Sequence, residues 1–196
     1  MTDARSPRPA AARQPTGKRE RLVLAASRLL HQQGVERTTL ADVAKSAEVP
    51  VGGVYYYFKT KDDVVSAVIE AHTQQTRRAL AQIEARERTP RDRLKALIAQ
   101  FVEQSETIAR FGCPLGGLCS ELDKRDGEPS TAAELMRVPL AWAEAQFHEL
   151  GRDDAHELAL ELIAAYEGHA LLANTLRDPA VLVNAADRIN RWIDEL

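Results

Sequence analysis

Long apolar runs are missing from this sequence. No uninterrupted apolar stretch approaches the roughly 20 residues that a helix needs to cross a membrane. The first twenty residues, MTDARSPRPAAARQPTGKRE, lack the apolar core of a secretory signal. Only two cysteines occur, Cys113 and Cys119, and so small a number suits a reducing compartment. We therefore expect a cytoplasmic protein with no membrane partner.

Patterns typical of enzymes and metal sites are also missing. The chain has no serine nucleophile elbow, no phosphate-binding glycine loop and no clear pair of catalytic carboxylates. His148, Asp153, His156 and Glu157 could form a metal site, but they lack His-x-x-x-His spacing and span an expected helix break. We expect no enzymatic activity, no cofactor and no metal.

The two cysteines offer little redox chemistry. They are six residues apart, so a regular helix would not place them on one face. A redox switch needs a lowered thiol pKa, and no cation follows until Lys124. Inert, buried thiols are the better interpretation.

Charge is distributed unevenly along the chain. Residues 1–61 contain eleven Lys and Arg against five Asp and Glu, a net charge of +6. Because the whole chain carries −3, residues 62–196 carry −9. A basic front and an acidic rear predict one polyanion-binding region and one region with a different task.

Residues 38–61, TTLADVAKSAEVPVGGVYYYFKTK, predict two short helices joined by a tight turn. Thr38 or Thr39 can cap the first helix, because a threonine hydroxyl satisfies free N–H groups of the first turn. Pro50 is suited to open the second helix, since proline has no N–H to lose. A helix between Gly17 and Gly34 would complete a three-helix unit.

The second of these helices has an unusual composition. Gly52 and Gly53 each cost about 1 kcal/mol of helix stability relative to alanine. Four aromatics follow from Tyr55 to Phe58, and they cannot all face one core, because neighbouring helix positions lie about 100° apart. Glycines permit close approach to a phosphate, and phenol hydroxyls can donate to phosphates or base edges. A small hairpin whose tyrosines pack on their own subunit is the alternative.

This stretch resembles the DNA-binding region of the TetR family of transcriptional repressors. The resemblance rests on Thr38-Thr39-Leu40, Val43-Ala44, the run from Gly53 to Phe58, and Lys59-Thr60-Lys61 with Asp62, Asp63 and Val64 after it. Two residues depart from the pattern: Val54 replaces a common leucine, and Val51 stands where a polar residue is frequent. The DNA-contacting residues that the resemblance implies are Thr39, Val51, Gly52, Gly53, Tyr55, Tyr56, Tyr57, Lys59 and Lys61.

The resemblance also implies a fold and a division of labour. We expect an all-α protein with a disordered arm (1–16), a helix-turn-helix DNA-binding domain (17–61) and an effector-binding and dimerisation domain (62–196). A basic arm can touch DNA electrostatically, although an inert tail is the simpler interpretation. Apolar periodicity predicts further helices over 61–88, 90–111, 131–150, 153–177 and 179–196, and a loop entering a short helix after Cys113.

The rear helices predict a cavity and a dimer. Pro139 lies inside a helix, where it kinks the backbone and lets neighbouring helices separate. A Gly-Cys-Pro element like that at 112–114 lines the effector pocket in one branch of the TetR family. The candidate ligand-binding residues are Phe101, Phe111, Cys113, Leu115, Leu118, Met136, Pro139 and Trp142. Surplus apolar surface on the last two helices predicts a homodimer through a four-helix bundle.

We therefore predict a transcriptional repressor that binds a palindromic double-stranded operator as a homodimer. A small, largely apolar effector would release it. Two alternatives remain open: a constitutive regulator with a filled rear core, and a helical enzyme with an accessory DNA-binding domain.

Overall fold

The computed structural model describes residues 17–126 and 132–196, and within them every regular element is a helix. The expected disordered arm, 1–16, lies outside the described residues. No helix in the described part of the chain combines the length and apolar character that a bilayer crossing requires. The helices are α1 (Lys18–Gln33), α2 (Leu40–Ser46), α3 (Val51–Tyr57), α4 (Lys61–Arg86), α5 (Pro90–Glu103), α6 (Ser105–Phe111), α7 (Pro114–Asp126), α8 (Ala133–Glu149), α9 (Ala155–Leu176) and α10 (Ala180–Glu195).

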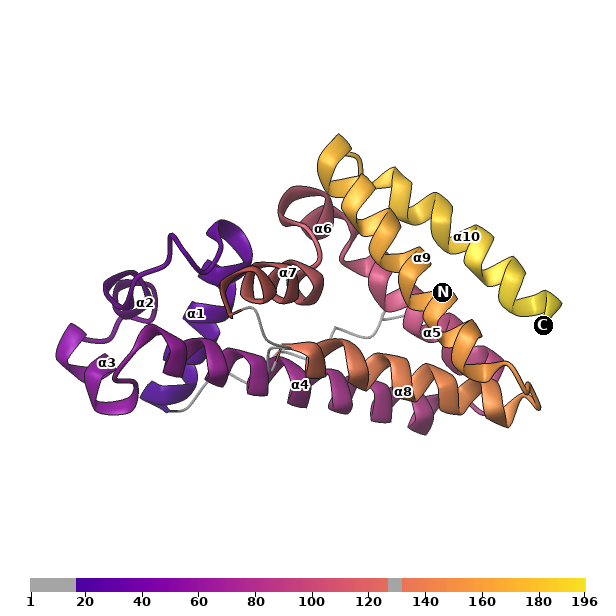
Figure 1. Ribbon diagram of the computed structural model, residues 1–196, viewed down its shortest axis with the longest axis horizontal. Coiled ribbons are helices and arrows are strands. Elements are labelled where there is room, and N and C mark those ends of the chain that lie inside the picture. The colour runs from indigo at the N-terminus through magenta and orange to yellow at the C-terminus, as the bar shows by residue number, and fades with distance from the viewer. Residues whose placement is uncertain (1–16, 127–131) are drawn as a thin grey trace, which may run out of the picture.

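Helices α1, α2 and α3 form the unit at one end of the molecule (Figure 1). Gly34 ends α1 with φ +82°, a left-handed conformation that glycine adopts without strain. Thr39 caps α2: its hydroxyl accepts from the N–H of Asp42, whose carboxylate accepts in return from the Thr39 N–H. Glu48 turns the chain towards α3 with φ +54°. The predicted helix–turn–helix is therefore present.

Helix α4 connects this unit to the rest of the protein (Figure 1). Thr60 and Asp63 form a second capping box at its start, which aligns the first turn directly after α3. The helix ends at Arg86, two residues before the predicted end. Its 26 residues span about 39 Å at 1.5 Å per residue, long enough to contact both halves of the molecule.

The core of the front unit extends into the rear half. One cluster of buried side chains joins residues of α1 to α4 with Leu118 and Leu122 of α7 and Leu135 of α8. A three-helix unit buries little apolar area by itself, so this shared core supplies additional burial. A domain boundary between Lys61 and Asp62 stays a prediction.

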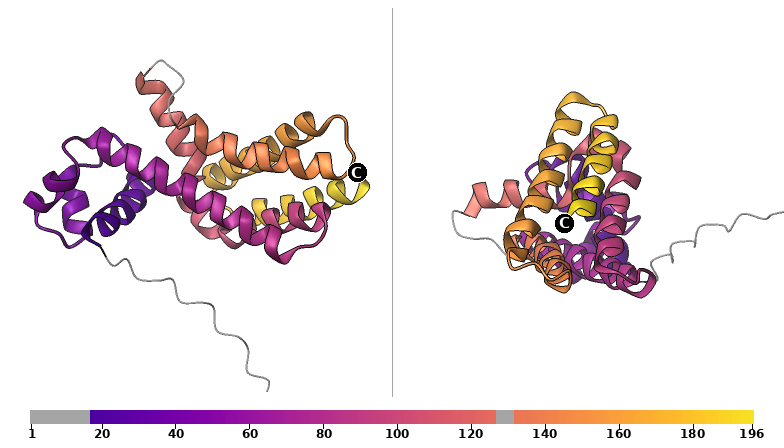
Figure 2. Two further views of the ribbon diagram at one scale, coloured as in Figure 1. Left: turned by 90° about the horizontal axis from the view of Figure 1, so that it is seen from below. Right: turned by 90° about the vertical axis from the view of Figure 1, so that its right-hand side faces the viewer.

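The rear half packs α8 against α9, α9 against α10, and α10 against α5 (Figures 1 and 2). Phe147 and Ile193 are fully buried between these helices, and Pro139 lies inside α8 as predicted. The far end of α7 projects away from the other helices (Figure 2). Helices α5, α8 and α9 of this bundle form part of the wall of the cavity described below.

Two predicted elements differ from the structure. The helix predicted over 90–111 is two helices, because the N–H of Gln104 bonds to the carbonyls of Phe101 and Val102 and interrupts the α-helical ladder. The segment after Cys113, predicted as a loop entering a short helix, is helical from Pro114 to Asp126. Proline is compatible with a first helical position, so α7 begins at the proline itself.

Candidate nucleic-acid interface and effector cavity

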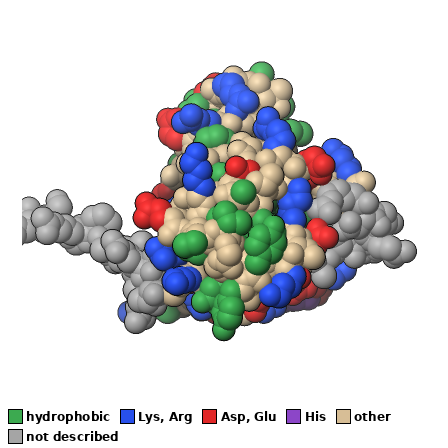
Figure 3. Space-filling view, turned by 90° about the vertical axis from the view of Figure 1, so that its left-hand side faces the viewer, with side chains coloured by type: hydrophobic (Ala, Val, Ile, Leu, Met, Phe, Trp, Pro, Cys, Tyr) green, Lys and Arg blue, Asp and Glu red, His purple; other side chains and the backbone are tan. Residues whose placement is uncertain are grey.

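The tip of α3 exposes most of its large side chains. Val54 and the following Phe58 are buried, and they hold the helix against the front core. The exposed fractions of the others are 48% for Val51, 49% for Tyr55, 77% for Tyr56 and 37% for Tyr57. Figure 3 shows hydrophobic side chains gathered at the centre of this end of the molecule, with Lys and Arg and some Asp and Glu around them. An exposed centre that includes three tyrosines, with Lys and Arg at its rim, is suited to a polyanion partner.

The two glycines of α3 have different surroundings. Gly52 is exposed, and a Cβ added to it would have no heavy atom of the described residues within 4 Å apart from its chain neighbours and the backbone of its own helix. A Cβ at Gly53 would lie 2.8 Å from Cγ1 of the buried Val49. Gly53 is therefore required for packing inside the protein, whereas no contact among the described residues requires a glycine at 52.

Several predicted phosphate-binding groups already have partners. The Lys59 Nζ donates to the carbonyl of Tyr55 over 2.6 Å. The Lys61 Nζ donates to the carbonyls of Val35 and Glu36, over 3.0 and 3.2 Å, and so stabilises the turn after α1. The Thr39 hydroxyl donates to the Asp42 carboxylate. An ammonium has three donors, so both lysines keep capacity for a further acceptor.

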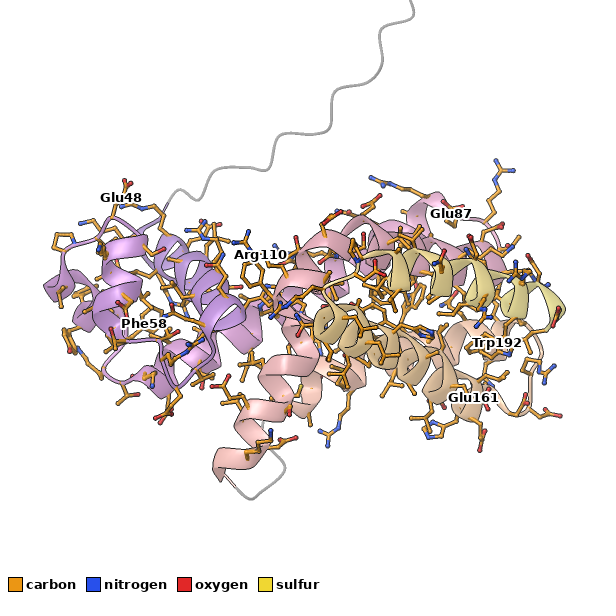
Figure 4. The ribbon with its side chains drawn as sticks, turned by 90° about the horizontal axis from the view of Figure 1, so that it is seen from above. Glu48, Phe58, Glu87, Arg110, Glu161 and Trp192 are labelled. Carbon is orange, nitrogen blue, oxygen red and sulfur yellow. The ribbon has the colours of Figure 1, made fainter. Side chains whose placement is uncertain are left out.

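The front unit carries further exposed cations that are not among the site residues predicted from the sequence. Arg37 and Lys45 are exposed in the turn before α2 and in its last turn. The net positive charge of residues 1–61 is the sequence feature that could have identified them. At the outer edge of this unit lies the acidic Glu48, while Phe58 belongs to its interior (Figure 4).

A cavity of about 190 Å³ lies in the rear half between α4, α5, α7, α8 and α9. Five of the eight predicted ligand-binding residues line it: Phe101, Cys113, Leu115, Met136 and Pro139. Leu80, Leu97 and Ile163 add apolar surface, and His72, Gln75, Thr76, Gln100, Gln104 and Glu167 add polar groups. An engineered apolar cavity of about 150 Å³ binds benzene, so this space admits a molecule of roughly one ring.

The remaining predicted residues lie elsewhere. Phe111 and Leu118 line a second cavity of about 210 Å³ between α1, α4, α6 and α7. Trp142 lies outside both cavities: its indole N–H donates to Glu84 over 2.8 Å, and its ring packs near Leu80 and Ile83. The two cavities share His72, Cys113 and Pro114 as a common wall.

Three polar groups meet at that wall. The Cys113 thiol donates to Glu167 Oε1 over 3.1 Å, and the Tyr166 hydroxyl lies 3.8 Å from the sulfur. Burial and the neighbouring Glu167 carboxylate raise the pKa of the Cys113 thiol to about 12. Burial likewise raises the pKa of the Glu167 carboxyl and, more strongly, that of Tyr166. A thiol with so high a pKa is not a nucleophile at neutral pH, as expected for an inert cysteine.

Hydrogen bonds join the front unit to the cavity walls. His31 of α1 donates to the carbonyl of Gly112 over 2.8 Å. Ser27 of α1 and His72 of α4 are hydrogen-bonded at 3.0 Å, and burial lowers the His72 pKa, so its imidazole is neutral. Arg110, beside this junction, lies between the two halves in Figure 4. A displacement of the cavity wall would therefore be transmitted to α1 through these hydrogen bonds.

Comparison with known proteins identifies the family. A family model described as "Bacterial regulatory proteins, tetR family" matches residues 22–68. The HTH-type transcriptional regulator TtgR of Pseudomonas putida is 32% identical over 187 residues, which cover 90% of this chain and 88% of TtgR. This chain belongs to the TetR family of transcriptional regulators.

Solved TetR-family structures share the whole fold. A TetR transcriptional regulator from Legionella pneumophila matches with a TM-score of 0.80 at 20% identity, covering 93% of this chain and 98% of that one. The reduced form of NemR from Escherichia coli matches with a TM-score of 0.73 at 26% identity, covering 88% and 95%. Front and rear halves are therefore arranged in this TetR-family regulator as in its relatives.

Sequence reasoning missed Glu167 in this TetR-family regulator. Its only signal was a carboxylate directly after Tyr166, on a helix that is apolar on two sides. Among the described residues no group of three or more His, Cys, Asp or Glu is arranged to hold a metal ion.

Proposed function

We propose that this protein is a homodimeric repressor that binds a palindromic operator and is released by a small effector in the rear cavity. The observation that carries the proposal is the exposed aromatic tip of α3 at one end of α4 and an unfilled cavity along the same helix. A constitutive regulator with a filled rear core would have no such cavity. The family supports the role in transcription.

The DNA interface comprises the nine residues predicted from the sequence. Tyr56, Tyr57 and Lys59 contact phosphates, with Thr39 and Lys61 as further contacts from the flanking turns. Val51, Gly52, Gly53 and Tyr55 face base edges in the major groove. The exposure of the three tyrosines supports these assignments, because tyrosines that packed on their own subunit would be buried.

The dimer forms through α9 and α10. Five large apolar side chains are exposed on these helices, namely Leu160, Leu171, Leu172, Leu176 and Val183. A symmetric four-helix bundle would bury this surface on both subunits. A twofold axis there orients two α3 tips towards the same side of a duplex, as a palindromic operator requires.

The effector acts by favouring a conformation that no longer matches the operator. It must bind that conformation better than the DNA-binding one, because equal affinity shifts no population. Cys113 and His72 border both cavities, and His72 is hydrogen-bonded to α1, so a ligand that moves this wall also moves the front unit.

A DNA-binding titration tests the proposal. Fluorescence anisotropy with duplexes from the DNA beside the protein's own gene should show specific binding by the wild type. Replacing Tyr56 with alanine should weaken binding to all sequences by a similar factor, because this exposed phenol is assigned to phosphate. The salt dependence should stay the same, since a neutral side chain releases no counterions. Lys61 is a poorer test, since its ammonium also holds the turn after α1.

The control variant is Gln82→Ala, which changes an exposed, neutral residue near the end of α4 that is far from α3 and should leave DNA binding unaltered. Leu171→Glu places a charge in the proposed dimer interface, and light scattering should then report monomers. Unchanged DNA binding in Tyr56→Ala would contradict the assigned interface. A monomeric wild type that still binds the operator would contradict the dimer.

A further inference from the structure

The carboxylate of Glu167 lies in the wall of the rear cavity without a cation. Among the described residues, its one hydrogen-bond partner is the Cys113 thiol, at 3.1 Å. No described Lys, Arg or His forms an ion pair with it. A carboxylate can accept about four hydrogen bonds, and a thiol is only a weak donor. The hydrogen-bonding capacity of the Glu167 carboxylate is therefore poorly satisfied.

The backbone leaves room for this carboxylate. A Cβ added at Gly116 would lie 2.5 Å from Glu167 Oε2, so the missing side chain at 116 is what allows the acid to occupy its position. The Gly116 N–H points to the Cys113 sulfur, at 3.4 Å, rather than to the acid. The first turn of α7 therefore accommodates Glu167 without neutralising it.

The cavity wall next to Glu167 offers aromatic rings and apolar side chains to an organic cation. Phe101 and Tyr166 are stacked, with ring centroids 3.6 Å apart, and both line the cavity. Aromatic faces attract cations within about 6 Å of the ring centroid. Leu97, Met136 and Ile163 provide apolar contacts for the rest of such a molecule.

We infer that the effector is an organic cation of about one-ring size, whose ammonium or amidinium group pairs with Glu167 while its apolar body packs against Phe101 and Tyr166. This inference rests on the proposed effector-responsive function and specifies the chemical class of the effector. An anionic effector would be repelled by the Glu167 carboxylate, and a neutral one would leave it without an opposite charge.

The titratable groups around the cavity determine the direction of the pH dependence. Burial raises the Glu167 pKa, so lowering the pH neutralises this acid earlier than an exposed glutamate and weakens cation binding. His72, which lines the same cavity, has a lowered pKa, and its protonation at low pH acts in the same direction. Cys113, Tyr166 and the nearby Cys119 have raised pKa values and stay neutral near pH 7.

Calorimetry with a matched pair of probes tests the inference. Benzylamine is a cation below pH 8, and benzyl alcohol is a neutral molecule with the same number of heavy atoms. Wild-type protein should bind benzylamine about ten- to a hundredfold more tightly at pH 7.5, the range expected when one partner of a hydrogen bond is charged. The benzylamine affinity should fall as the pH is lowered towards 5, while that of benzyl alcohol stays constant.

Two variants locate the charge. Glu167→Gln should reduce benzylamine affinity at least tenfold and leave benzyl alcohol within twofold of wild type. Glu103→Gln is the matched control: it removes an exposed carboxylate from α5, a helix that also borders the cavity, and should keep the preference. Circular dichroism checks that both variants fold; if Glu167→Gln does not, the wild-type probe pair and its pH dependence decide.

The inference is overturned if wild type shows no preference for benzylamine, if neither probe binds, or if the preference survives in Glu167→Gln. Operator binding is measured in the same samples, so that failure of the cationic-effector inference can be distinguished from failure of the proposed function. Equal binding of both probes together with probe-induced release of DNA overturns only the cationic effector. A protein that binds no operator overturns the proposed function.

Discussion

The two adjacent glycines of α3 provide a test in which one substitution, Gly52→Ala, should raise stability while it lowers DNA affinity. Neither Gly52 nor Gly53 has a positive φ, so alanine can adopt the backbone at both positions. Gly52→Ala places a methyl group in open space, whereas Gly53→Ala places one 2.8 Å from Val49 Cγ1. The two substitutions are chemically identical and differ only in what the new methyl group contacts.

The expected magnitudes follow from these surroundings. Alanine stabilises a helix over glycine by about 0.5–1 kcal/mol, so Gly52→Ala should raise the Tm by roughly 1–4 °C for a chain of this size. Gly53→Ala gains the same preference but crowds a β-branched, buried valine that has little freedom to move. Overpacking costs about 1–3 kcal/mol, so the net result should be destabilisation by up to about 2.5 kcal/mol.

Thermal unfolding followed by circular dichroism measures the stability, and fluorescence anisotropy measures operator binding. If the backbone at Gly52 approaches DNA closely, the added methyl group should weaken operator binding at least tenfold in a protein that is more stable than wild type. Loss of binding would then have no explanation in folding. A stabilised Gly52→Ala protein with wild-type DNA affinity would refute the close approach, and a destabilised one would refute the description of its surroundings.

Three further predictions concern the rear half and its junction with the front. Trp142→Phe removes the hydrogen bond to Glu84 and replaces the indole by a smaller aromatic ring. Unfolding should therefore show a loss of about 1 kcal/mol from the hydrogen bond and a further loss from reduced packing. Ligand affinity should not change, because Trp142 lies outside both cavities. Cys113, with a pKa of about 12, should resist iodoacetamide at pH 8 in the native protein and react in urea. The half-buried Cys119, with a pKa of about 11, should react slowly in the native protein. Mass spectrometry of native and unfolded samples measures both reactions, and rapid native labelling of Cys113 would contradict its burial. His72 has a lowered pKa in the folded protein, so the unfolded state binds more protons as the pH falls below about 6.5, and stability should decrease there. His72→Gln should lack this part of the pH dependence in urea titrations, and identical profiles for variant and wild type would exclude a buried, neutral imidazole.

Local sequence patterns predicted most helix starts and the identity of the front unit. Thr39, Gly34 and Pro90 act at helix ends through hydrogen bonds and φ preferences that involve only a few neighbouring residues. The break at Gln104 escaped prediction, because the apolar stripe continues across it while the helix direction changes. Periodicity reports which face of a helix is apolar, and it contains no information on a bend within a continuous stripe.

By itself the sequence determined that this is an all-helical TetR-family regulator with tyrosines that cannot all enter one core, because both conclusions depend on residue order alone. Only the tertiary structure decided which distant residues share a cavity. It brought Glu167 to Cys113, 54 positions apart, and directed Trp142 to Glu84 instead of the cavity. The physical reason is that a helical pattern specifies the buried face of each helix, whereas the partner across that face depends on how all the helices pack together.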